Sequence, residues 1–284
     1  MAGADVSTAK RPDRMHLAHL YRYPVKSLGG ERLDAAAPEE RGLRDDRRWM
    51  FVDGDGAFLS QRSQRRLAQY RAALDGEHGL TFTRVADGAR VGRVLRARPG
   101  GAPMLSVEVW GHRFAAAEVR DDGLADLTAE LGIPGARLVY MNDATRRAAD
   151  PVHARHGEEV SFADGFPYLL ITDASLRALG ERYGGDLDVR RFRPNLVVGG
   201  VDEAFAEDGW AGIRVGDDAF YNAKPCARCG VITHDPDTGD VDRGVQRALS
   251  ALRRGPGGKL LFGVNCCWAG GRGALRVGDA VEVG

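Results

Sequence analysis

The chain contains, at residues 49–60, the sequence WMFVDGDGAFLS, in which an apolar run, a Gly/Asp turn and a second apolar run follow one another. Two short apolar runs joined by such a turn predict a β-hairpin. Further short apolar runs predict more strands on both sides, at 17–23, 80–85, 91–97 and 105–110. The first half of the chain is therefore predicted to be mostly β, ending near residue 135.

Helical spacing of apolar residues is confined to three short segments. A helix is predicted over 122–131, and another begins at Thr172 or Asp173, either of which can cap it, and ends at about Tyr183. A third helix is predicted over 244–253, with Val245, Leu249 and Leu252 facing the core. Buried strands are predicted at 168–171 and 195–198. The expected fold class is α+β, mostly β.

The sequence Arg-Val-Gly-Asp occurs twice, at 214–217 and at 276–279. Each copy lies between alternating apolar residues, which predicts two hairpin turns of one barrel. Two copies so far apart do not predict a solenoid, because repeat proteins need several adjacent copies.

The composition disfavours several classes of protein. The 284 residues carry 40 basic and 40 acidic side chains, so no overall field attracts nucleic acid or an anionic membrane. No stretch is apolar enough for a membrane span or a signal peptide. The four cysteines form two close pairs, Cys226 with Cys229 and Cys266 with Cys267, and nothing else points to secretion. We expect a cytoplasmic protein with reduced thiols, no nucleic acid partner and no membrane partner.

The most specific local pattern is KPCARC at 224–229, followed by DPDTG at 235–239. A C-x-x-C pair can be a redox disulfide, half of a zinc site, a ligand of another metal, or two core cysteines. Zinc is disfavoured because a second C-x-x-C or an H-x₃-H is missing. The redox pair is disfavoured because it should open a helix, whereas 230–233 is predicted as a strand. Lys224 and Arg228 flank the pair and favour a thiolate, which a soft metal requires.

Three other segments carry candidate anion-binding groups. Lys26 and Ser27 follow the first strand, although a surface lysine is the commoner outcome at such a place. Residues 44–48 hold three arginines directly before a strand, although most such runs are solvated faces that neighbouring aspartates neutralise. Arg193 precedes a proline, which predicts an extended backbone and a fixed direction for its guanidinium.

Considered together, these motifs make the chain resemble the MOSC-domain proteins, and most closely the branch of the mitochondrial amidoxime-reducing component and its bacterial relatives. The motifs are YPVKS (23–27), RFRPN (191–195), CARC (226–229) and DPDTG (235–239). The resemblance extends from about residue 17 to the C-terminus. It implies a molybdenum cofactor, with molybdenum carried by a molybdopterin, bound between two domains.

The resemblance also implies the domain organisation. Residues 1–14 are expected to be a disordered tail, 15–135 an N-terminal β-rich MOSC domain, and 136–284 a barrel-like MOSC domain.

Residue by residue, the resemblance assigns Cys229 as the molybdenum ligand and as a catalytic residue. Asp164 matches a position that lines the metal site and is the second catalytic candidate. The residues that the resemblance implies for cofactor binding are Lys26, Ser27, Arg47, Arg193, Asn195 and Cys229. Cys226 resembles a neighbour of the ligand rather than a ligand. Cys266 and Cys267 are either core residues or residues that line the active site or tune its redox state.

The resemblance implies an oxidoreductase that reduces small N-oxygenated compounds such as hydroxylamines, amidoximes or N-oxides. The sequence lacks the four-cysteine run of a plant-type iron–sulfur domain, so electrons are expected from a separate ferredoxin-, flavoprotein- or cytochrome b5-like donor. One alternative is a carrier that holds sulfur or the cofactor on Cys229. Another is a biosynthetic enzyme on the same scaffold, which only the unusual segment 266–268 favours.

Overall fold

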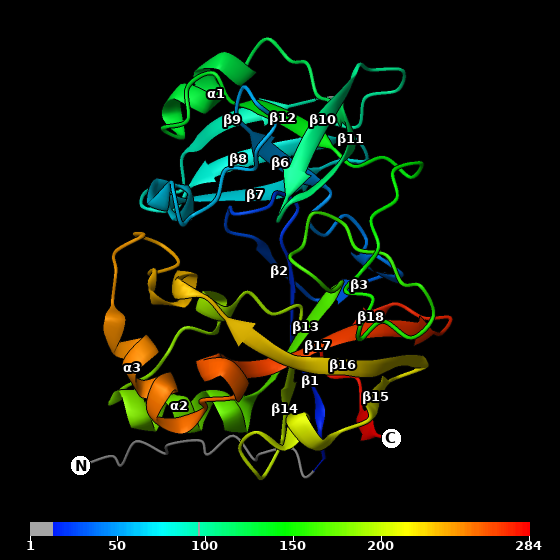
Figure 1. Ribbon diagram of the computed structural model, residues 1–284, viewed down its shortest axis with the longest axis vertical. Helices are drawn as coiled ribbons and strands as arrows, with labels where there is room; N and C mark the ends of the chain where they lie inside the picture. Colours follow the sequence, from blue (N-terminus) through cyan, green and yellow to red (C-terminus); the bar gives the residue numbers. More distant parts are fainter. Residues whose placement is uncertain (1–13, 96) are drawn as a thin grey trace, which may run out of the picture.

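The computed structural model describes residues 14–95 and 97–284, so nearly all of the tail predicted over 1–14 lies outside the described residues. Two β-rich lobes follow one another along the long axis of the molecule (Figure 1). The predicted class, α+β and mostly β, is confirmed. The three α-helices are α1 (Leu124–Glu130), α2 (Asp173–Tyr183) and α3 (Arg243–Leu252). Short 3-10 helices cover Arg65–Gln69, Val189–Phe192, Ala206–Gly209, Gly230–Thr233 and Pro256–Gly258.

The N-terminal lobe consists of the strands from β6 to β12 together with α1. It contains a four-stranded sheet in the order β10-β11-β12-β6 and a three-stranded sheet in the order β7-β8-β9. The apolar faces of these elements share a core that includes Trp49, Phe51 and Phe82. The strands are β6 (Trp49–Val52), β7 (Tyr70–Asp75), β8 (Gly79–Arg84), β9 (Arg90–Val94), β10 (Met104–Val109), β11 (His112–Glu118) and β12 (Arg137–Tyr140).

The C-terminal lobe is built on an eight-stranded sheet in the order β19-β15-β16-β17-β13-β14-β1-β2. The helices α2 and α3 lie beside this sheet (Figure 1). Its strands are β1 (His16–Arg22), β2 (Glu31–Leu33), β13 (Tyr168–Thr172), β14 (Leu196–Gly199), β15 (Gly212–Val215), β16 (Asp218–Arg228), β17 (Leu260–Gly270) and β19 (Val281–Val283). Two small ladders complete the fold, β3 (Ala35–Ala36) with β18 (Leu275–Arg276) and β4 (Pro38–Glu39) with β5 (Gly42–Leu43).

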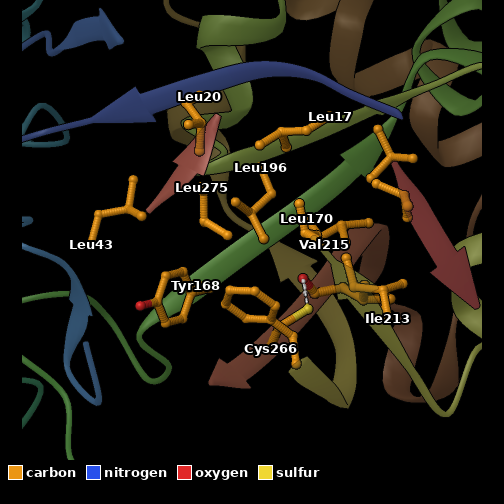
Figure 2. Packing of buried hydrophobic residues seen from close by; sticks show 14 of the residues in the cluster. Leu17, Leu20, Leu43, Tyr168, Leu170, Leu196, Ile213, Val215, Cys266 and Leu275 are labelled. Carbon is orange, nitrogen blue, oxygen red and sulfur yellow. Dashed lines mark hydrogen bonds between the residues drawn. The ribbon is translucent and has the colours of Figure 1, made fainter. Parts of the chain in front are cut away.

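The first strand belongs to the sheet of the second lobe. β1 runs antiparallel to β14, with Leu20 opposite Leu196, and its buried leucines Leu17 and Leu20 pack into that sheet's core. Figure 2 shows this core, where Cys266 of β17 lies among aliphatic and aromatic side chains. The domain boundary at residues 135 and 136 stays a prediction, but β2 also belongs to this sheet and β3 pairs with β18, so the strands of the N-terminal lobe begin only at β6.

The helices follow from local signals. The Thr172 hydroxyl accepts a hydrogen bond from the Ser175 amide and begins α2, and Gly184 ends it with a left-handed φ of 93°. The Asp242 side chain caps α3 in the same way. Val245 and Leu249 are buried as predicted, but Leu252 is 39% exposed, so the predicted inward position of Leu252 is wrong because the helix ends there.

Two predicted turns have different outcomes. The Arg-Val-Gly-Asp copy at 214–217 does connect a hairpin, β15 with β16. The copy at 276–279 does not, because β18 pairs with β3 while β19 pairs with β15. The run after β6 folds back on it through an amide-to-carbonyl bond from Leu59 to Phe51 of 2.9 Å, but forms only isolated bridges rather than a regular strand.

Candidate functional site

One cavity of about 310 Å³ between the two lobes contains every residue predicted for the site. These residues come from five separate segments of the chain. They are Lys26, Ser27, Arg47, Asp164, Arg193, Asn195 and Cys229. The N-terminal lobe adds Phe58 and residues 60–62 to the wall. We call this space the site cavity.

Three of these residues have a left-handed backbone. The φ angles are 72° for Ser27, 50° for Arg47 and 56° for Arg193. Non-glycine residues pay for this conformation, and such strain gathers at functional sites. The extended backbone predicted for Arg193 is therefore wrong. Arg193 ends the 3-10 helix Val189–Phe192, and its amide donates to the Arg190 carbonyl at 3.1 Å, which holds the turn in place.

Lys26 is buried, and its ammonium donates to the Asp164 carboxylate at 2.6 Å and to the Phe162 carbonyl at 2.8 Å. Burial lowers the pKa of Lys26, although Asp164 opposes the shift. Desolvation by neighbouring groups would raise the pKa of Asp164, whose side chain is 62% exposed, but the nearby Lys26 charge and hydrogen bond hold it well below its usual range. Asp164 is therefore a carboxylate at neutral pH.

Trp110 contacts the site without lining its cavity, and the sequence did not indicate it. It lies in the tight turn between β10 and β11 with φ 54°, and its indole nitrogen donates to Asp164 at 3.0 Å. The Arg62 guanidinium lies 4.0 Å from the Trp110 ring centroid, and Phe58 packs edge-on against the same ring. In the sequence Trp110 was only the last residue of a predicted strand, so no local signal separated it from a core residue.

Arg47 and Arg193 both stack on Tyr23, with guanidinium-to-centroid distances of 4.5 and 4.3 Å. Arg47 is paired with the buried Asp46 at 2.5 Å, so the predicted neutralisation by that aspartate is confirmed. Arg193 donates to the Leu28 carbonyl at 2.6 Å and has no carboxylate partner among the described residues. Burial, together with the charge of Arg47, lowers the pKa of Arg193 to about 10, which leaves it charged at neutral pH.

Asn195 lines the cavity, but its amide is already engaged with the protein. Its oxygen accepts from Arg47 at 3.0 Å and from the Leu169 amide at 3.3 Å, and its nitrogen donates to the Tyr21 carbonyl at 3.1 Å. Asn195 therefore fixes the guanidinium of Arg47 and ties three strands together. The Ser27 hydroxyl, in contrast, has no hydrogen-bond partner within residues 14–95 and 97–284 and stays available to a ligand.

The two cysteines of the motif lie where β16 ends. Cys229 is exposed and precedes the 3-10 helix Gly230–Thr233, so the strand predicted over 230–233 is wrong: the Thr233 hydroxyl bonds back to the Gly230 carbonyl and closes a turn. Arg228 donates to the Cys226 sulfur at 3.1 Å. Lys224, the other flanking cation, pairs with Asp150. Of the two predicted cationic neighbours, only Arg228 contacts a thiol.

The DPDTG segment forms a tight turn, held by the Asp235 carboxylate, which accepts from the amides of Asp237 and Thr238 at 3.0 Å. Its aspartates also fix arginines of both lobes. Asp237 pairs with Arg71 at 2.8 Å and with Arg190 at 2.7 Å, and Asp235 pairs with Arg191 at 3.0 Å. The turn therefore orders arginines beside the site cavity.

Cys266 and Cys267 are fully buried and pack in two different clusters on opposite faces of β17. Neither lines the site cavity, although their neighbour Asn265 does. Of the two interpretations left open for them, the structure supports core residues.

Within residues 14–95 and 97–284, no three or more His, Cys, Asp or Glu side chains are placed to hold a metal ion together. A metal in the site cavity would therefore need most of its ligands from a bound group. The helices of the same part of the chain include none that is long and apolar enough to span a membrane.

The fold and the site agree with one family. Residues 157–282 match the model of the MOSC domain, and residues 14–132 match the model of the MOSC N-terminal beta barrel domain. The chain belongs to the MOSC-domain family.

Curated relatives identify the branch. The chain is 30% identical to human mitochondrial amidoxime reducing component 2, over 80% of this chain and 69% of the relative. It is 28% identical to mouse mitochondrial amidoxime-reducing component 1, over 93% of this chain and 81% of the relative. It is also 28% identical to the molybdenum cofactor sulfurase of Oryza sativa subsp. japonica, over 92% of this chain but 33% of that protein. The predicted resemblance is confirmed.

Proposed function

We propose that the site cavity holds a molybdenum cofactor and that the protein is an oxidoreductase that reduces N-oxygenated compounds such as hydroxylamines, amidoximes or N-oxides. The observation that carries this proposal is that one cavity contains both an exposed thiol, Cys229, and an excess of cationic side chains. Seven cationic side chains line the cavity against a single carboxylate, Asp164. The cations are Lys26, Arg47, Arg62, Arg191, Arg193, Lys224 and Arg228.

The charge balance fits an anionic group. Four of the seven cations have a carboxylate partner, whereas Arg62, Arg193 and Arg228 have none within the described ranges. Arg228 also has a buried Nε without a hydrogen-bond partner there. Buried charges and polar groups are costly unless they are paired, so a bound phosphate would relieve this cost. Guanidinium forks and a free hydroxyl at Ser27 suit phosphate oxygens.

The donor set also fits molybdenum. A thiolate at Cys229 is a soft ligand, and the protein offers no competing cluster of hard ligands in the part of the chain that the structure describes. Lys26, Ser27, Arg47 and Arg193 would hold the phosphate, with Asn195 orienting Arg47. When bound, the cofactor supplies the two-electron redox chemistry, and the protein supplies binding and orientation.

Asp164 would act in its charged state. Because its pKa is held below the usual range, it is ionised at neutral pH, has no proton to donate, and accepts hydrogen bonds. We assign it the role of orienting Lys26 and the indole of Trp110 at the cavity wall, which supports the proposed site without a proton transfer from Asp164.

One further part of the proposal rests on the named relatives. Proteins named amidoxime-reducing components support the N-reductive activity. Electrons would come from a separate ferredoxin-, flavoprotein- or cytochrome b5-like donor. The second candidate function is a carrier of sulfur or of the cofactor, which the exposure of Cys229 and the similarity to a molybdenum cofactor sulfurase favour.

The test is the molybdenum content, by elemental mass spectrometry, of protein made in a host that synthesises the cofactor. Near-stoichiometric molybdenum in the wild type, a loss of at least about tenfold in Cys229→Ser and little loss in Cys226→Ser would support the proposal. The loaded wild type must then reduce a hydroxylamine or N-oxide with an artificial electron donor. A persulfide on Cys229 without molybdenum would instead support the carrier.

A further inference from the structure

A second cavity of about 320 Å³ adjoins the site cavity. The two share Gln61, Arg191, Arg193 and Val231 in their walls. Five arginines line the second cavity, which we call the arginine cavity: Arg32, Arg71, Arg190, Arg191 and Arg193. They come from β2, from β7 and from the segment 190–193, so both lobes contribute.

Carboxylates compensate only three of these arginines. Arg190 pairs with Asp188, and the DPDTG turn supplies the partners of Arg71, Arg190 and Arg191. Arg32 and Arg193 have no carboxylate partner within the described part of the chain. Arg32 is exposed on the edge strand β2, whereas Arg193 is buried between the two cavities. The wall therefore carries two positive charges without a carboxylate partner, Arg32, which lines this cavity alone, and Arg193, which also borders the site cavity.

Two buried polar atoms on the same wall lack partners. The Tyr23 hydroxyl and the Nδ1 atom of His234 are inaccessible to solvent and make no hydrogen bond in the described structure. Tyr23 is 2% exposed and His234 is 9% exposed, and both line the arginine cavity. Buried polar groups nearly always have a partner, and the Tyr23 ring lies 4.3 Å from the Arg193 guanidinium, so a polar ligand in this cavity would find hydrogen-bonding groups beside a cation after a small side-chain rotation.

We propose that the arginine cavity is a second anion site that binds a phosphate ester. The guanidinium groups of Arg32 and Arg193, which come from separate segments of the chain, suit phosphate oxygens. The rings of Tyr21 and Tyr23 and the apolar Pro236 give an organic group a surface to pack on. The volume of the cavity lies at the lower end of the range for small-molecule sites.

The phosphate has two possible sources with the same chemistry. It belongs either to an extension of the cofactor in the site cavity, reaching past Arg193, or to a separate phosphorylated small molecule. The first source rests on the proposed function, whereas the second does not.

The test compares Arg32→Gln with the control Arg214→Gln, an exposed strand arginine of the same sheet that has no ion pair in the described residues. Inorganic phosphate is titrated calorimetrically into the purified protein with its bound cofactor. Arg32→Gln should weaken phosphate binding about fivefold by removing one charge-assisted contact, and Arg214→Gln should not. Arg71→Gln, from the other lobe, is the second variant if Arg32→Gln melts early.

The released cofactor is analysed by mass spectrometry in the same samples. Phosphate binding that Arg32→Gln weakens selectively supports a separate phosphorylated ligand. The second outcome is that added phosphate does not bind and that the released cofactor carries a nucleotide extension. If Arg32→Gln also retains this cofactor less well than Arg214→Gln, the cofactor is the source of the phosphate. No binding together with a cofactor that has a single phosphate overturns the proposal, as does equal binding by both variants. If the wild-type protein contains a bound cofactor but no molybdenum, that result counts against the proposed function. The phosphate titration can still be interpreted.

Discussion

Two pairs of cysteines lie on two neighbouring strands, and their surroundings are opposite. Cys226 and Cys229 lie at the end of β16, where the ladder with β17 stops, and Cys229 is exposed to the site cavity. Cys266 and Cys267 lie in the middle of β17, opposite Asn222 and Tyr221 of β16, and both are fully buried. A cysteine is therefore a candidate metal ligand at the end of the β16–β17 ladder and a core residue in the middle of the same ladder.

The difference follows from strand position rather than from the local sequence. A residue in the middle of a central strand has a neighbour on either side and a packed layer on its face, so its thiol behaves as a small apolar group. A residue at a strand end borders the loops, where ligand sites collect. Spacing within the pair, whether adjacent or C-x-x-C, matters less than where the ladder ends.

The largest expected effect is on thiol reactivity. Burial raises the pKa of the Cys266 thiol well above its usual value, and burial chiefly raises that of Cys267 to about 11. At pH 8, cofactor-free protein should react with a thiol reagent at Cys229 at least about 100-fold faster than at Cys266 or Cys267, because only thiolates react. Peptide mapping by mass spectrometry measures the rates.

A matched experiment uses the cofactor-loaded protein. Loading should protect Cys229 and leave the buried pair unchanged. Equal labelling of Cys229 and Cys267 in native protein would contradict the assignment of Cys267 as a protected core residue, because it would mean that β17 opens as readily as the end of β16.

The second effect is on stability. Cys266→Ala removes a sulfur that packs in the core and lies 3.1 Å from the Asn222 side-chain oxygen, so the free energy of unfolding should fall by about 2 kcal/mol. Cys229→Ala, at an exposed position, should change it by less than about 0.5 kcal/mol. Thermal melting of cofactor-free protein gives both values. A larger loss for Cys229→Ala than for Cys266→Ala would contradict the assignment of the two pairs.

Most of the fold could be predicted from short-range patterns. The helix α2 was indicated by its cap at Thr172, and β6 by its apolar run before a Gly/Asp turn. What the sequence did not indicate was pairing between distant segments. The strand β1 joins the sheet of the second lobe, and the second Arg-Val-Gly-Asp copy joins two different partners, because strand pairing depends on tertiary contacts that no local window contains.

The site was predictable where a motif carried it and not elsewhere. All seven proposed residues meet in one cavity, although their roles stay predictions. Trp110 was missed because a tryptophan at a strand end is usually a core residue, and only the packing of the two lobes brings it to Asp164. The conformation of Arg193 was predicted incorrectly because a 3-10 helix end and contacts to Tyr23 and Leu28 outweigh the preference of a residue before proline.

The third effect is the pH dependence of stability that the buried pair produces. The folded-state pKa of Cys267, about 11, is above that of an unfolded thiol, so the unfolded chain loses its proton first as the pH rises. Stability is therefore fully present below about pH 8.5 and is lost toward pH 11, with about 2 kcal/mol lost by pH 10. Melting of wild type and Cys267→Ala between pH 8 and 10 should show a shallower decline in the variant. In Cys229→Ser, stability should decline with pH as steeply as in the wild type. If the decline is equally steep in Cys267→Ala, the Cys267 thiol does not cause it.

The smallest expected effect concerns Asp164, a charged residue that lines the site cavity together with Cys229, whereas Cys266 and Cys267 lie outside it. Trp110→Phe removes the indole donor from the Asp164 carboxylate, whose side chain is 62% exposed, so the free energy of unfolding at pH 7 should fall by only about 0.5 kcal/mol. Because the folded-state pKa of Asp164 is held well below its usual range, this carboxylate stays charged in the folded protein at pH 3 as at pH 7, so the difference between the two proteins should be the same at both. Melting of both proteins at pH 7 and pH 3 checks this, with Trp210→Phe as the control for ring size. A difference that is lost at pH 3 would mean that Asp164 gains its proton in the ordinary range, and that its contacts with Lys26 and Trp110 do not hold its charge.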